Sequence, residues 1–355
     1  MSTLLDIDGS AHSGSGMIVR QALAYAAITG TPLRMWNVRA HRPKPGLQPQ
    51  HLCGVLAMRD LVGGSLEGAH LGSREFSFRP GEESPRGLYR FDVGTAGSAT
   101  VLALALLPVL ATAVEHVRLD LTGGLFQDRA PSPLHLQHVL VPLLGRMGLA
   151  VEATVLRPGY VPRGEGLLRL EVQPSEGLTA LDASQQAPVH EIWGISLASH
   201  LRARRVSARM AASAREVLCA AGHQARIDEY DDTTAVQPGA GIALFADLAD
   251  GMRLGADGAG AVGRPAEMVG SATAHRLLED LGSGATLDRY AEDQIVVFAA
   301  FAAGQTRARP ALVTEHLRAA LWLAELFGVA STHHDAGMLV IEPRRERRTG
   351  GLTSG

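Results

Sequence analysis

Apolar and polar positions alternate along this chain with two periods, one near 3.6 residues and one of 2 residues, which are typical of amphipathic helices and half-buried strands. The helical period marks residues 14–30 and 46–64. The strand period marks residues 3–8, 32–40 and a closely spaced pair within 65–80. These segments predict a βαβαββ-like unit, in which a helix follows each of the first two strands.

The same order of elements recurs twice. Each copy exposes apolar helical faces, which bury themselves only when such units stack around a common core. The second copy is predicted to have helices at 97–113 and 133–148 and strands at 116–124, 150–159 and 166–174. The third is predicted to have helices at 288–304 and 314–328 and strands at 306–313, 329–334 and 336–343.

Residues 184–277 do not follow this order. They contain strand-like segments at 190–199 and 241–250, helix-like segments at 208–222 and 264–281, an acidic turn at 228–234 and a Gly-rich loop. The predicted fold class is therefore α/β. Three βαβαββ-like repeats form a large domain, residues 1–183 and 278–343, and a smaller α/β domain, 184–277, is inserted before the third repeat. The tail, 344–355, is predicted to be disordered.

Composition narrows the choice of partners. With 355 residues, 46% of them hydrophobic, the chain can bury a large core. Its net charge of -3 argues against a basic coat for long nucleic acid, so any such contact should be local, at a strand end. The only cysteines, Cys53 and Cys219, lack the spacing of a zinc site, which favours a reducing cytoplasm.

No membrane segment is expected. The most apolar stretch, residues 100–114, is shorter than the roughly 20 residues that span a bilayer, and it contains Pro108. It is therefore interpreted as a buried helix. The amino terminus enters an apolar strand without the features of a secretion signal, and a cytoplasmic location is predicted.

Residues 37–52 are the most unusual local feature. They hold Arg39, Arg42 and Lys44 together with three prolines and no acidic residue. Lys44 is the only lysine in a chain with 33 basic residues, which suggests a need for a compact ammonium group. The segment predicts a local anion site. The alternative is an ordinary solvated basic loop.

Three segments together resemble the RNA 3'-terminal phosphate cyclase family. They are "RAHRPKPGLQPQH" at 39–51, "YAEDQ" at 290–294 and "TEHL" at 314–317. The resemblance extends over nearly the whole chain, with further landmarks in family order at 94–110, 122–134 and 263–270. It also implies three repeats with an inserted α/β domain, as the hydrophobic pattern does.

The resemblance implies an enzyme that converts an RNA 3'-terminal phosphate to a 2',3'-cyclic phosphate with ATP. His316 matches the histidine that accepts AMP and passes it to the RNA. Thr314 is a plausible N-cap, so His316 falls in the first helical turn, where the helix dipole favours a neutral imidazole. The alternative is a histidine that is merely polar at a helix start.

The resemblance also implies two groups of binding residues. On the nucleotide side are Pro131, Tyr290, Asp293 and Gln294, which match positions that hold the adenosine, and a glycine-rich loop at 9–16, with Gly14, ahead of a helix carrying Arg20. On the RNA side are Arg39, Arg42, Lys44, Gln50 and His51. A divalent cation, Mg²⁺ or Mn²⁺, is expected to be held mainly by nucleotide phosphates rather than by the protein. A homodimer is possible.

Several positions depart from the family pattern. Ser13 stands where a metal-binding glutamate is common, Leu104 replaces a glutamine near the nucleotide, and Glu165 occupies a segment that usually lacks it. Ala319 and Ala320 replace a Thr-Asn pair. These departures leave a second interpretation open, a relative that adenylylates another phosphorylated end. A non-catalytic cyclase-like protein of ribosome assembly also stays open, although such relatives lack the nucleophilic histidine. An enolpyruvyl transferase would explain neither the insertion nor the basic segment.

Two motifs are interpreted as coincidental. Residues 258–263 fit G-x-G-x-x-G, but a poor apolar strand precedes them and no acid follows at the required distance. His333, His334 and Asp335 look like metal ligands but fall where a turn between two strands is expected.

Overall fold

Three four-stranded sheets with one strand order form the larger part of this computed structural model, which describes residues 4–128 and 130–344. In each sheet the first two strands are parallel and the other neighbours are antiparallel. The orders are β1-β2-β4-β3 (Leu5–Asp8, Leu33–Trp36, Phe76–Arg79, Ser65–Glu67), β5-β6-β8-β7 (Gly87–Asp92, Val117–Gly123, Gly166–Val172, Val151–Arg157) and β9-β14-β16-β15 (Asp182–Ala183, Thr306–Ala308, Met338–Pro343, Ala330–Asp335). The predicted α/β class is confirmed.

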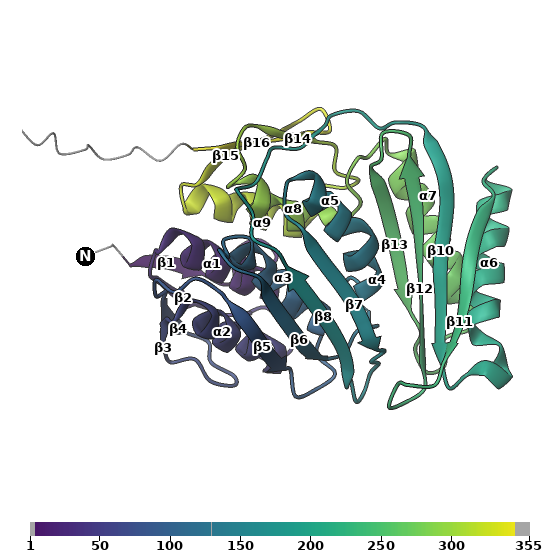
Figure 1. Cartoon of the computed structure of the whole chain (residues 1–355), viewed down its shortest axis with the longest axis horizontal. Coiled ribbons are helices and arrows are strands. Elements are labelled where there is room, and N and C mark those ends of the chain that lie inside the picture. The colour runs from purple at the N-terminus through teal and green to yellow at the C-terminus, as the bar shows by residue number, and fades with distance from the viewer. Residues whose placement is uncertain (1–3, 129, 345–355) are drawn as a thin grey trace, which may run out of the picture.

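Helices from all three units pack on one another beside these sheets (Figure 1). Helix α1 contacts α2, α3 and α9, and α8 contacts α3 and α9, so the three units share one apolar core. The helices are α1 (Gly16–Thr29), α2 (Pro49–Val62), α3 (Ala99–Leu110), α8 (Ala291–Ala299), α9 (Glu315–Leu326), and a broken helix made of α4 (Pro133–His135), a π-helical turn at Leu136–Leu140 and α5 (Val141–Arg146).

A fourth sheet stands beside this body (Figure 1). Its order is β11-β10-β12-β13 (Ala225–Asp232, Val189–Ser199, Gly239–Leu248, Arg253–Ala259), and α6 (Val206–Ala220) and α7 (Ala266–Gly282) pack against it. In the chain it lies between β9 and α8, so the inserted segment separates the first strand of the third sheet from the helices that follow.

Two expectations for the insertion were wrong. The acidic segment at 228–234 is mostly strand, because β11 continues to Asp232 at the edge of its sheet, and the chain turns only after Asp232, whose carboxylate accepts the N–H groups of Thr234 and Ala235. The Gly-rich segment before Gly263 contains a strand, β13, whose small residues allow close packing: a Cβ on Gly258 would collide with Thr273 of α7. The short strands β5 and β9 had no matching expectation.

Most of the apolar stretch at 100–114 is a buried helix, as predicted: nearly all side chains of α3 are shielded from solvent, including Pro108, although the helix ends at Leu110 and Val114 is exposed. Within residues 4–128 and 130–344, no helix has both the length and the apolar character needed to cross a membrane. The predicted disordered tail lies, after Arg344, outside the described residues.

Candidate active site

A cleft of about 560 Å³ lies where the amino-terminal ends of α1, α8 and α9 meet the basic segment 37–52. Helix starts expose unpaired N–H groups and a partial positive charge, which suits an anionic ligand. The lining residues are Ser15, Gly16, Met17, Arg20, Arg39, Arg42, Gln50, His51, Val101, Pro131, Arg289, Tyr290, Asp293, Gln294, Leu312, Thr314 and His316. Every predicted site residue except Gly14 and Lys44 is in this set.

His316 occupies the first turn of α9 and lines the cleft. Thr314 caps the helix, its hydroxyl accepting a hydrogen bond from the Leu317 N–H at 3.0 Å, as the sequence predicted. The His316 side chain is exposed to the cleft, but its neighbours partly desolvate it and so lower its pKa; Asp293 opposes this, and Arg20 and Arg42 lower the pKa further. The imidazole is therefore uncharged near neutral pH, which is the form that acts as a nucleophile.

The basic segment forms one wall of the cleft. Arg39, in a left-handed backbone conformation with φ of 52°, donates to the carbonyls of Lys44 and Gly46 at 2.6 and 2.9 Å. Arg42 donates to the carbonyl of Ser13 at 3.0 Å. Arg39 thus holds its own segment and Arg42 holds the loop before α1, both through neutral partners, so these contacts do not compensate their positive charge.

His51 faces the cleft from the first turn of α2. Its Nδ1 accepts the backbone N–H of Gln48 at 3.2 Å, and its ring lies so close to Gly16 that any side chain there would collide with it. Burial, together with the charges of Arg39 and Arg20, lowers the pKa of His51 to about 3. His51 is consequently a neutral hydrogen-bonding group at physiological pH.

The remaining predicted RNA-side residues differ in placement. Gln50 lines the cleft, but its Oε1 already accepts the backbone N–H of Ser98 at 3.0 Å, at the start of α3. Lys44 is exposed and does not line the cleft. Gly14 also lies off the wall, with φ of 51° and its carbonyl directed at Nε of Arg42, 3.4 Å away. The predicted contacts of Gly14 and Lys44 with ligands therefore lack support in this geometry.

A second set of lining residues, which we call the α8 wall, comes from α1 and α8 and adjoins the basic segment, since the His51 ring lies against Gly16 of α1. Asp293 is 3% exposed and pairs with Nη2 of Arg20 at 3.5 Å, while Gln21 donates to the Asp293 carbonyl at 3.0 Å. Arg20 keeps its Nε without a hydrogen-bond partner although it is buried. The guanidinium of Arg20 lines the cleft as well, and a guanidinium in this position is suited to a phosphate oxygen.

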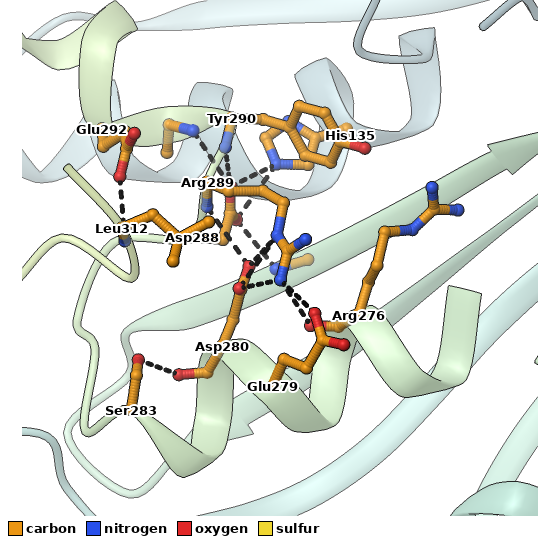
Figure 2. Close-up of polar contacts among 12 residues, drawn as sticks. His135, Arg276, Glu279, Asp280, Ser283, Asp288, Arg289, Tyr290, Glu292 and Leu312 are labelled. Carbon is orange, nitrogen blue, oxygen red and sulfur yellow. Dashed lines mark hydrogen bonds and ion pairs between the residues drawn. The ribbon is translucent and has the colours of Figure 1, made fainter. Parts of the chain in front are cut away.

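Arg289 is a cleft residue that the sequence did not indicate. It directly precedes the predicted Tyr290, and its partners Glu279 and Asp280 belong to α7, just beyond the predicted end of the insertion at residue 277 (Figure 2). The run of charges in residues 288–293 was the only available signal. No spacing rule connects that run to α7.

Few hard oxygen ligands face the cleft. Ser13 is hydrogen-bonded to Ser15 at 2.9 Å, and the carboxylate of Asp293 is paired with Arg20. Across residues 4–128 and 130–344, no three His, Cys, Asp or Glu side chains gather in a group that could hold a metal ion. His333, His334 and Asp335 are exposed in strand β15, rather than in the turn after it.

Two other departures from the family pattern lie away from the cleft. Leu104 is buried within α3, and Glu165 forms an ion pair with Arg163 at 3.0 Å. The G-x-G-x-x-G match at 258–263 lies between β13 and α7, but β13 pairs antiparallel with β12 and is not part of a parallel βαβ unit, so it lacks the geometry of a dinucleotide site.

Comparisons with known proteins agree on one family. The model of the RNA 3'-terminal phosphate cyclase family matches residues 11–333. A protein named RNA 3'-terminal phosphate cyclase from Thermococcus onnurineus is 39% identical over 326 residues, covering 92% of this chain and 94% of that protein. Its namesake from Pyrococcus abyssi is 37% identical over 324 residues, covering 91% and 93%.

One solved structure, the enolpyruvyl transferase NikO from Streptomyces tendae, aligns at 16% sequence identity. The alignment covers 48% of this chain and 33% of the NikO chain. Its TM-score of 0.27 is too low to indicate a shared fold. The family match and the two relatives, by contrast, extend over nearly the whole sequence. This chain belongs to the RNA 3'-terminal phosphate cyclase family.

Proposed function

We propose that this protein is an ATP-dependent enzyme that converts the 3'-phosphate of an RNA end to a 2',3'-cyclic phosphate through a histidine-AMP intermediate. The observation that carries the proposal is the placement of His316. A neutral imidazole at a capped helix start faces a cleft that has arginines on both walls.

In the first step, His316 attacks the α-phosphorus of ATP. A bond forms between the imidazole nitrogen and phosphorus, and the bond to the bridging oxygen breaks, which releases diphosphate. Arg20, whose guanidinium lines the cleft, is proposed to hold a phosphate oxygen as negative charge builds up. Tyr290, Gln294 and Pro131 line the same region and are proposed to hold the adenosine.

In the second step, an oxygen of the RNA 3'-phosphate attacks the phosphorus of the histidine-AMP, which frees His316 and gives an RNA-adenylate. The neighbouring 2'-hydroxyl then attacks the 3'-phosphorus, closes the cyclic phosphate, loses its proton and expels AMP. Arg39, Arg42 and His51 are proposed to hold the terminal phosphate. A forked guanidinium and a neutral imidazole can both donate to its oxygens.

A divalent cation is proposed to act with ATP, where it would neutralise phosphate charge. The shortage of carboxylates in the cleft supports binding of Mg²⁺ or Mn²⁺ chiefly through the phosphates. The RNA 3' end is the proposed partner, a cytoplasmic location is proposed from the cysteine usage, and a homodimer stays possible.

One alternative within the family is a non-catalytic protein that binds RNA. The presence of His316 in the cleft favours catalysis. Incubating the protein with α-labelled ATP and Mg²⁺, followed by denaturation, should give an acid-labile protein-AMP adduct. Addition of a 3'-phosphorylated RNA should discharge the adduct and give a cyclic end. A protein that binds both ligands but forms no adduct would contradict the proposal.

A further inference from the structure

The carboxylate of Asp288 joins three parts of the molecule just before helix α8 (Figure 2). Both of its oxygens lie 3.0 Å from Nε2 of His135, in the broken helix of the second unit. One oxygen accepts the Gly255 N–H of β13 at 2.8 Å. The other accepts the N–H groups of Tyr290 and Ala291, each at 2.9 Å, and so caps α8.

This junction is almost inaccessible to solvent. Asp288 is 0% exposed and His135 is 2% exposed. Burial alone would lower the pKa of His135, but the adjacent Asp288 carboxylate outweighs it and raises the pKa, so the two groups form a buried charged pair. Removing one partner of such a pair leaves the other charge uncompensated, which is strongly destabilising to the local arrangement.

The two residues after Asp288 are fixed on either side. The ring of Tyr290 rests edge-on against the His135 imidazole, with centroids 5.4 Å apart and planes at 72°. Arg289 bonds to Asp280 of α7 through Nε at 3.0 Å and through Nη2 at 2.6 Å. Residues 288–290 are therefore held by the second unit, the inserted sheet and α7 together (Figure 2).

The residues held in this way form part of the cleft. Tyr290 and Arg289 both line it, and Asp293 and Gln294 follow within the first turn of the helix that Asp288 caps. We propose that Asp288, paired with His135, is a positioning residue that sets Tyr290 and the first turn of α8 at the geometry required for nucleotide binding. The pair touches no reacting atom and acts through the residues it holds. This inference rests on the proposed use of ATP in the same cleft.

A purely structural pair would change stability without changing nucleotide affinity. Asp288→Asn removes the charge but keeps an oxygen that can cap α8. His135→Gln keeps an N–H donor near the Nε2 position without the charge. Asp120→Asn is the matched control, because Asp120 is an 11% exposed carboxylate paired with Arg118 and Arg169 in strand β6, away from the cleft.

We measure three quantities for each variant: the ATP concentration that gives half-maximal formation of the histidine-AMP adduct, the maximal rate of its formation, and the melting temperature. Asp288→Asn should raise the half-saturating concentration about ten-fold, equivalent to about 1.4 kcal/mol of binding free energy, with little change in maximal rate. His135→Gln should shift it in the same direction by less, and Asp120→Asn should leave it unchanged.

A folded Asp288→Asn protein with the parental half-saturating concentration overturns the inference, as does a loss confined to the maximal rate or an equal shift in Asp120→Asn. If Asp288→Asn does not fold, His135→Gln decides by the same criterion, and failure of both to fold makes the pair structural and also overturns it. Absence of an adduct in the parent protein would instead contradict the proposed function.

Discussion

The two walls of the cleft use arginine in different ways. On the basic wall, Arg39 and Arg42 donate to backbone carbonyls, which carry no net charge. On the α8 wall, Arg20 and Arg289 pair with buried carboxylates, Asp293 and Asp280. The first arrangement keeps positive potential available to an anion, whereas the second neutralises charge and fixes geometry.

This difference suggests a division of labour. An incoming RNA phosphate needs uncompensated positive charge, and the basic wall provides it. A nucleoside needs groups that are already in place, because ordering them during binding costs affinity. We therefore expect changes to the basic wall to act on transfer to RNA and changes to the α8 wall to act on the reaction with ATP.

The largest effect is expected from His316→Ala, which should abolish the protein-AMP adduct and with it both downstream steps. Its fold should persist, since the Thr314 cap remains and a helix-start polar residue contributes only about 1 kcal/mol. The measurement is incorporation of label from α-labelled ATP, with a melting curve. His334→Ala, at an exposed position in β15, is the control and should keep full incorporation. An undiminished adduct in His316→Ala would place the nucleophile elsewhere.

The next largest effects are expected from Arg42→Ala and His51→Ala. Each loses a hydrogen bond to a phosphate oxygen, so transfer of AMP to RNA should slow by about 10- to 100-fold, while adduct formation keeps most of its rate. Arg39→Lys should also slow transfer, because an ammonium cannot form a bidentate fork. Transfer is followed in a single turnover with a 3'-phosphorylated oligonucleotide.

The control for this prediction is Arg34→Ala, which removes a positive charge from strand β2, where Arg34 pairs with Glu75. It should leave transfer unchanged. If Arg34→Ala slows transfer as much as Arg42→Ala does, the effect comes from overall charge and the basic wall has no specific role.

Sequence and structure agree best where the determinants are local. The apolar period predicts α1, α3 and α9 to within a few residues, and the Thr314 cap is visible from residue type alone. Strands β11 and β13 were missed because acidic and small side chains make poor strand signals, and neighbouring strands in the sheet supply what the sequence pattern lacks.

The cleft, too, could be predicted only where its determinants are local in the sequence. Most of its lining follows from helix starts and from the resemblance of a few segments to one family. The pairs that hold the α8 wall could not be predicted, because His135 and Asp288 are 153 positions apart and Arg20 and Asp293 are 273 apart. Their partners are fixed by packing between units. Lys44, which stood out as the only lysine of the chain and then matched a family position, does not line the cleft in the tertiary structure.

A smaller effect is expected on the stability of the protein at alkaline pH, and it comes from helix α8. Glu292 is fully buried and accepts the Leu312 N–H at 3.3 Å (Figure 2), and burial raises its pKa to about 8 from an ordinary value of 4.5. The folded protein thus holds this proton more tightly than the unfolded chain. The resulting stabilisation is complete below pH 4.5 and is lost as pH rises through about 8.

Glu292→Gln removes this titration, so its melting temperature should fall less than that of the parent between pH 6 and pH 9, about one unit above the raised pKa of 8. Glu315→Gln, at an exposed position in α9, should follow the parent. Parallel curves for all three proteins would show that Glu292 does not carry a raised pKa.

The smallest effect is expected from Lys44→Arg. The uniqueness of this lysine suggests a specific ammonium contact, but its exposed side chain outside the cleft wall predicts cyclisation within about two-fold of the parental rate, as for most exposed charges. The rate is measured with a 3'-phosphorylated oligonucleotide. A much larger loss would mean that the segment reorganises around the RNA end.

The division between the walls is tested most directly by a pulse-chase experiment on the parent, Arg42→Ala and Asp293→Asn. Each protein is first charged with α-labelled ATP, freed of nucleotide, and then mixed with 3'-phosphorylated RNA. Arg42→Ala should form the adduct at close to the parental rate and discharge it slowly, whereas Asp293→Asn should form it slowly and discharge it at the parental rate. If both variants slow the same step, the two walls do not have separate roles.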